Sequence, residues 1–165
     1  MTSNHIDTGK VSERRRLRFE SIDEVLAEIG RIDQADESGR LRRLGNWTPG
    51  QILAHIAVWI EYGYEGYPIS PPPWFVRWIL RWQVKKCLRD GMPAGVRIPG
   101  AENGTYGIDE MATKDAAARL KNVLLRLKTN EPSEFDSPAF GIMNHEDRIR
   151  LNLRHAELHL GFVNY

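Results

Sequence analysis

Apolar residues recur at every third or fourth position in five separate stretches of the chain. This spacing is typical of one buried face of an α-helix. An early example is the series Ile22, Val25, Leu26, Ile29 and Ile32. The pattern predicts helices over residues 21–32, 48–62, 74–88, 113–127 and 144–163. No segment of any length alternates apolar and polar residues as a half-buried strand would, so the sequence predicts the all-α class.

The helix over 48–62 has the strongest start signal. Thr48 is a preferred N-cap residue, Pro49 suits the first helical position, and Gln51 completes a Thr-x-x-Gln capping box. Trp47, just before the cap, is expected to pack onto Ile52 as a hydrophobic staple. These signals fix where the helix begins and therefore which of its side chains point inward.

The helix over 74–88 has two interpretations. Its tryptophans Trp74, Trp78 and Trp82 mark one face, and basic residues follow the opposite edge. A basic, tryptophan-rich helix is typical of a membrane surface. We favour instead a core helix with a basic outer stripe, because the domain needs core residues and the net charge is near neutral.

The segment 89–111 is the longest irregular stretch and is rich in Gly and Pro. Loops of this length in compact domains tend to be lids, binding loops or disordered segments. We expect it to cover one end of the helices. Its glycines do not have the spacing of a nucleotide-binding fingerprint, and no predicted strand precedes them, which excludes a phosphate-binding loop.

Composition indicates one ordinary globular domain. The 165 residues are 41% hydrophobic and 27% charged, and the net charge of +1 gives no reason to expect nucleic acid. We predict a flexible polar tail over 1–19 and a helical domain over 20–165. No apolar run reaches the roughly 20 residues of a membrane span. The single Cys87 and the absence of an apolar leader segment predict a cytoplasmic location.

Candidate chemistry is concentrated in the last helix. His155 and His159 are four residues apart, so they lie on one helix face about 6 Å apart along the axis. Their face is otherwise apolar. His55 is expected to point inward from the helix over 48–62. Imidazole is the commonest metal ligand, and three protein ligands leave an open position, as in catalytic zinc sites. The three histidines therefore predict a metal site.

The alternative is a set of core histidines that are hydrogen-bonded to backbone or Tyr hydroxyls. The remaining His5 and His145 do not fall in register with the three. Glu157 follows His155 by two residues, about 200° around the helix, so it points away from any bound ion. The glutamate base of a His-Glu-x-x-His metalloprotease is therefore absent, and no catalytic residue is identified.

Two motifs together resemble the DinB/YfiT-like superfamily. They are Trp47-Thr-Pro-Gly-Gln-Ile-Leu-Ala-His55 and His155-Ala-Glu-Leu-His159-Leu-Gly161. The stretch from Phe140 to His155 looks closer still to a DinB-like branch of unknown function. The resemblance implies a DinB-like four-helix bundle, here with an additional Trp-rich helix and a long Gly/Pro loop. It also implies a divalent metal held by His55, His155 and His159.

Characterised members of that superfamily include transferases that use a low-molecular-weight thiol, and metal-dependent isomerases and hydrolases. By this resemblance we expect a metal-dependent transferase or hydrolase that uses the three-His site with an open coordination position. Zn or Ni is the favoured ion, with Fe, Co and Mn as alternatives. A small thiol or another small substrate is the expected partner, and a homodimer stays open. The alternative is a non-catalytic bundle that binds a small ligand or a protein, with core histidines or a structural metal.

Overall fold

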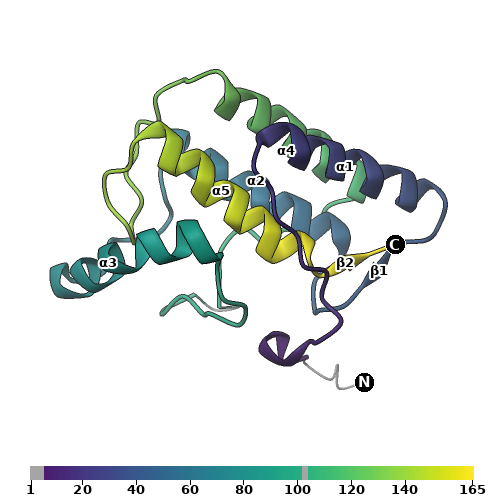
Figure 1. Cartoon of the computed structure of the whole chain (residues 1–165), viewed down its shortest axis with the longest axis horizontal. Coiled ribbons are helices and arrows are strands. Elements are labelled where there is room, and N and C mark those ends of the chain that lie inside the picture. Colours follow the sequence, from purple (N-terminus) through teal and green to yellow (C-terminus); the bar gives the residue numbers. More distant parts are fainter. Residues whose placement is uncertain (1–5, 102–103) are drawn as a thin grey trace.

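The computed structural model describes residues 6–101 and 104–165, and this part of the chain is mainly helical (Figure 1). Within these two ranges, a 3₁₀ turn, η1 (Thr8–Lys10), precedes five α-helices and one antiparallel pair of two-residue strands. The helices are α1 (Ile22–Glu37), α2 (Pro49–Glu65), α3 (Trp74–Asp90), α4 (Thr113–Lys128) and α5 (His145–Leu160), and the strands are β1 (Arg42–Arg43) and β2 (Val163–Asn164). The helical class is confirmed; the four-helix-bundle topology stays a prediction. His5, with the rest of residues 1–5, and loop residues 102–103 lie outside the described residues.

The core lies between α1, α2, α4 and α5, which pack side by side in Figure 1. Each contributes the apolar stripe that its helical periodicity predicts. Fully buried members include Ile29, Leu53, Leu120, Leu124 and Leu160. None of the described helices combines the length and the apolar content that crossing a membrane requires.

The capping box predicted at the start of α2 is confirmed. The Thr48 hydroxyl accepts a hydrogen bond from the backbone N–H of Gln51 at 3.2 Å, and the Gln51 side chain accepts one from Thr48 N–H at 2.9 Å. Gly50, the residue before Gln51, packs so closely on the loop between α3 and α4 that a Cβ there would lie 2.0 Å from the carbonyl oxygen of Met111. Both features fix the register of α2.

The last helix is shorter than predicted. It ends at Leu160, and Val163 belongs to β2. Gly161 is its C-cap, and the N-terminal segment passes so close there that a Cβ on Gly161 would lie 2.8 Å from the carbonyl oxygen of Arg15. The chain then pairs with the α1–α2 connection, Arg43 opposite Val163. This small sheet ties the end of α5 to the segment that leads into α2.

The prediction that residues 74–88 form a core helix is wrong. No residue of α3 is buried, and the side chains of Trp74 and Trp82 are 81% and 72% exposed. Figure 1 shows α3 lying beside one part of α5 and projecting away from the other helices. The physical reason is that the other four helices already fill the core, so the tryptophan face has no partner within the described chain.

Residues 11–19 run along α5 towards α1 (Figure 1). The backbone N–H of Arg15 donates to the Gly161 carbonyl at 3.0 Å, and that of Phe19 donates to Glu157 at 2.6 Å. The predicted boundary between a flexible tail and the helical domain at residue 20 stays a prediction. These contacts show that residues 15–19, before that boundary, are hydrogen-bonded to the last turn of α5 and to Gly161.

Glu28 anchors this arrangement. Its buried carboxylate accepts hydrogen bonds from Arg15 at 2.5 Å, from Arg31 at 2.7 Å and from the Tyr165 hydroxyl at 3.1 Å. Burial alone would raise the pKa of Glu28, but the bonds from Arg15 and Arg31 outweigh it and hold that pKa below its ordinary value of 4.5. The ionised form therefore stabilises the folded state.

Replacing Glu28 by glutamine is expected to lower the free energy of unfolding by about 1.5–3 kcal/mol near pH 7, the contribution of hydrogen bonds to a charged group. Because the pKa is lowered on folding, this contribution is present above pH 4.5 and is lost as the pH falls below it. Urea unfolding at neutral and acidic pH measures both effects. The exposed Glu146, paired with Arg150, is the control: Glu146→Gln is expected to cost less than about 1 kcal/mol. Equal losses for the two variants would contradict the anchoring role.

Candidate metal centre

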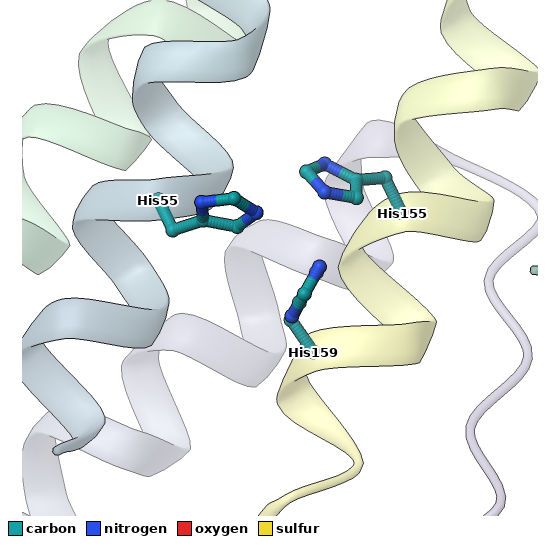
Figure 2. A group of neighbouring side chains, drawn as sticks. All are labelled: His55, His155 and His159. Carbon is teal, nitrogen blue, oxygen red and sulfur yellow. The ribbon is translucent and has the colours of Figure 1, made fainter. Parts of the chain in front are cut away.

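Three histidines from two helices converge in the space between α2 and α5. Figure 2 shows His55 pointing from α2 towards His155 and His159 on α5. One ring nitrogen from each lies within 4.8 Å of the others, and the ring centroids are 4.5 to 5.1 Å apart. The spacing of four residues places His155 and His159 one turn apart, and the register of α2 aims His55 at them. The structure thus brings together the three residues singled out in the sequence.

His55 is held in one tautomer by the backbone. Its side chain is only 2% exposed, and its Nδ1 lies 3.0 Å from the carbonyl oxygen of Tyr106. A carbonyl can only accept, so Nδ1 carries the proton and Nε2 keeps a lone pair. Histidines that bind metals usually donate the second ring N–H to such an acceptor.

His155 and His159 are half-buried and have no such partner. Among the described residues, neither ring takes part in a hydrogen bond to backbone or to a Tyr hydroxyl. The core-histidine alternative expects such bonds for all three rings, and the structure provides one for His55 alone. The nitrogens of the other two rings are therefore available to a ligand.

The surroundings keep all three imidazoles neutral at physiological pH. Burial lowers the pKa of His55 to about 4, although its hydrogen bonds to the backbone at Tyr106 and Gly107 act in the opposite direction. Burial also lowers the pKa of His155 and of His159 well below 6.5, and the neighbouring imidazoles lower both further. A neutral imidazole is the form that binds a metal ion.

Two tryptophan rings wall the cluster. Trp47 stacks on His159 with a centroid distance of 5.4 Å and lies 4.9 Å from His55. Trp59 meets the rings of His55 and His155 edge-on at 6.0 Å. The residue predicted as a helix staple therefore also lies against the histidines. Such aromatic walls shield a site from water and fix the ring orientations.

The loop between α3 and α4 approaches the cluster through its backbone. The Tyr106 carbonyl that holds His55 also accepts from Trp59 Nε1 at 3.3 Å, and Gln51 donates to the Ile108 carbonyl at 3.3 Å. Gly107 permits this approach: its φ is +71°, and a Cβ there would lie 2.1 Å from Val58 Cγ1. The sequence did not predict the role of Tyr106, because its backbone carbonyl makes the contact and every type of residue has such a carbonyl. The glycine beside it was the one available signal.

Two other polar side chains of α5 are engaged away from the cluster. Glu157 points away from the cluster, as predicted: its carboxylate accepts from Phe19 N–H and lies 2.7 Å from Arg154 Nη1, and burial raises its pKa. The Asn152 amide donates to the carbonyl of Arg148 in its own helix. Within the described residues, the cluster of metal-ligating side chains contains no carboxylate and no thiol.

The donor set fits a transition-metal ion. Three neutral imidazoles suit Zn and neighbouring divalent metals. Nitrogens around one tetrahedral ion lie roughly 3.4 Å apart, given metal–nitrogen distances of about 2.1 Å. The three nitrogens observed here lie within 4.8 Å of one another. Small rotations of the histidine side chains would bring them to the shorter separation that a bound ion requires.

The comparisons with known proteins identify a family. The sequence profile of a family described as "Protein of unknown function (DUF1569)" matches residues 11–165. No curated protein and no solved structure matches the chain. The assignment to the DinB/YfiT-like superfamily, inferred from the two histidine motifs, is wrong by this match, because those motifs cover few of the residues that the profile spans. The expectation of a thiol-dependent transferase or a metal-dependent hydrolase depended on that assignment and stays a prediction without that support. The chain belongs to the DUF1569 family.

Proposed function

We propose that His55, His155 and His159 bind one divalent transition-metal ion and leave a coordination position for a small ligand. Zn or Ni is the favoured ion, with Fe, Co and Mn as alternatives. The observation that carries the proposal is the convergence of three neutral imidazoles whose nitrogens lie within 4.8 Å, with one ring already held through its second nitrogen. Three protein ligands are typical of sites that exchange water or substrate.

The chain's own residues have distinct parts in this proposal. His155 and His159 supply two nitrogens from consecutive turns of α5, and His55 supplies Nε2 because Tyr106 holds its Nδ1 proton. Trp47 and Trp59 limit access of water on the sides they cover. A bound ion would polarise a substrate oxygen or lower the pKa of a bound water.

A second candidate is a non-catalytic site that binds a small ligand through the ion. It is favoured by the absence of any carboxylate from the described metal-ligating cluster. Hydrolysis at a three-ligand centre usually employs a nearby general base, and Glu157 is occupied by Phe19 and Arg154. The two candidates share the metal and differ only in turnover.

Metal content tests the shared proposal. Purified tag-free protein is dialysed against each ion and measured by plasma mass spectrometry, beside His55→Ala and the control His145→Ala. His145 is a half-buried histidine of α5 outside the cluster. We expect about one equivalent in the wild type and the control, and near none in His55→Ala. Wild-type protein that takes up no ion, or uptake that His55→Ala leaves unchanged, would overturn the proposal.

A further inference from the structure

The exposed face of α3 is the largest feature that the proposed metal site leaves unexplained. Five large apolar side chains point outward from its first half: Trp74, Phe75, Trp78, Ile79 and Trp82, each at least 50% exposed. Trp78 and Trp82 are one helical turn apart, and the centroids of their rings are separated by 5.4 Å. Large apolar patches on a soluble domain mark interaction sites, whereas single exposed residues do not.

Positive charge is concentrated on the same helix. α3 carries five basic residues and one acidic residue, so its net positive charge exceeds that of the whole chain, which is +1. The acidic residue, Asp90, is paired with Arg89. The other four, Arg77, Arg81, Lys85 and Lys86, form no ion pair with any described carboxylate. On α4, by contrast, four of the five basic residues are paired with acidic residues: Arg119, Lys121, Arg126 and Lys128.

The spacing joins the two features into one surface. Residues 75, 78, 79, 82, 86 and 89 follow the three- and four-residue steps of a single helix face. The face is therefore apolar over its first turns and basic at Lys86, which forms no ion pair with a described carboxylate, and at Arg89, which is paired with Asp90. Long basic side chains reach sideways from such a face to charged groups while their aliphatic parts stay on apolar surface.

We propose that α3 docks the protein on an anionic membrane surface, with the tryptophan face in the lipid interface and the basic residues on the headgroup phosphates. Trp at the interface together with Lys and Arg is the composition of helices that lie in the plane of a bilayer. A second copy of α3 is a poorer occupant, because it would bring five more basic residues to the same contact. Anionic headgroups neutralise these charges.

Vesicle sedimentation tests this docking. The wild-type chain is mixed with phosphatidylcholine vesicles that contain about one quarter phosphatidylglycerol, and with pure phosphatidylcholine vesicles. We expect at least about tenfold stronger partitioning onto the anionic vesicles, and a fall of similar size between about 0.1 M and 0.5 M NaCl, since salt screens exposed charges. No binding, or equal binding to both vesicles, would overturn the proposal.

Variants separate the two halves of the surface. The double variant Trp78→Ala/Trp82→Ala is expected to lower partitioning at least about tenfold, and Lys85→Gln/Lys86→Gln about fivefold for each charge. Leu125→Ala, which removes a 50% exposed apolar side chain from α4, is the matched control and is expected to change nothing. Circular dichroism confirms that each variant is folded.

Light scattering addresses the competing occupant. If the chain is a dimer that Trp78→Ala/Trp82→Ala converts to a monomer, and neither form binds vesicles, the surface belongs to a second copy and the membrane proposal fails. Metal uptake by the double variant is expected to equal that of the wild type, because α3 contributes no residue to the cluster. The two proposals can therefore fail independently.

Discussion

Zn²⁺ at about 1,000 times its dissociation constant is expected to raise the free energy of unfolding by about 4 kcal/mol. In a domain of this size that corresponds to an increase in Tm of about 8–16 °C. The reason is that the site draws ligands from two helices, His55 on α2 and the other two histidines on α5. An ion that bridges them binds the folded chain and has no equivalent site in the unfolded one. Differential scanning calorimetry with and without Zn²⁺ measures the shift.

His155→Ala provides the comparison. It removes one nitrogen and leaves His55 and His159, so the Zn²⁺-dependent increase in Tm is expected to shrink to within about 2 °C. His145→Ala is expected to keep the full increase, and excess chelator is expected to abolish it in every form. A shift of the same size in His155→Ala would mean that Zn²⁺ stabilises the protein from some other site.

Replacing Gly107 by alanine is expected to weaken Zn²⁺ binding about 10- to 100-fold, the usual effect of losing a group that orients a metal-binding histidine. The residue before it, Tyr106, supplies the carbonyl that accepts the hydrogen bond from His55 Nδ1–H. A Cβ at Gly107 would lie 2.1 Å from Val58 Cγ1, and the φ of +71° strains any residue other than glycine. The loop therefore has to withdraw from α2, and Tyr106 withdraws with it. Competition with a chromophoric chelator measures the affinity.

Gly100→Ala separates backbone strain from close approach. Gly100 lies in the same loop with a similar φ of +84°, but no described atom comes within 4 Å of the position of its Cβ. Its substitution is expected to cost stability through backbone strain, of order 1–2 kcal/mol, and to leave Zn²⁺ affinity unchanged. Equal affinities for Gly107→Ala and the wild type would show that the loop does not hold His55 in place.

The parts of the structure that could be predicted are those that neighbouring residues determine. The Thr48–Gln51 capping box sets the start of α2, and the register that follows aims His55 inward. The four-residue spacing of His155 and His159 places them on one face whatever surrounds α5. The capping box and the histidine spacing were therefore enough to identify the three residues of the cluster. Neither of them determines how closely α2 and α5 approach each other.

The exposure of α3 could not be predicted in this way. Periodicity indicates that a helix has an apolar face, but the partner of that face depends on how many other helices compete for the core. Here four helices bury one another, and the face with Trp74 and Trp82 is left over. The contact of Tyr106 with His55 could not be predicted from the sequence for a different reason. It is made by a backbone carbonyl, which every residue has. The family assignment was wrong because it was based on short stretches around the three histidines, whereas the DUF1569 profile matches residues 11–165.

The five tryptophans are divided between the two surfaces, and this gives each surface its own optical signal. Trp47 and Trp59 lie against the histidines, so a paramagnetic ion such as Co²⁺ in the cluster would quench their fluorescence. Trp74, Trp78 and Trp82 face solvent. We expect their fluorescence emission to be red-shifted and to be quenched by acrylamide. Insertion into lipid would move that emission to shorter wavelengths without affecting the first pair. One emission spectrum can therefore report on ion occupancy and on membrane contact in the same sample.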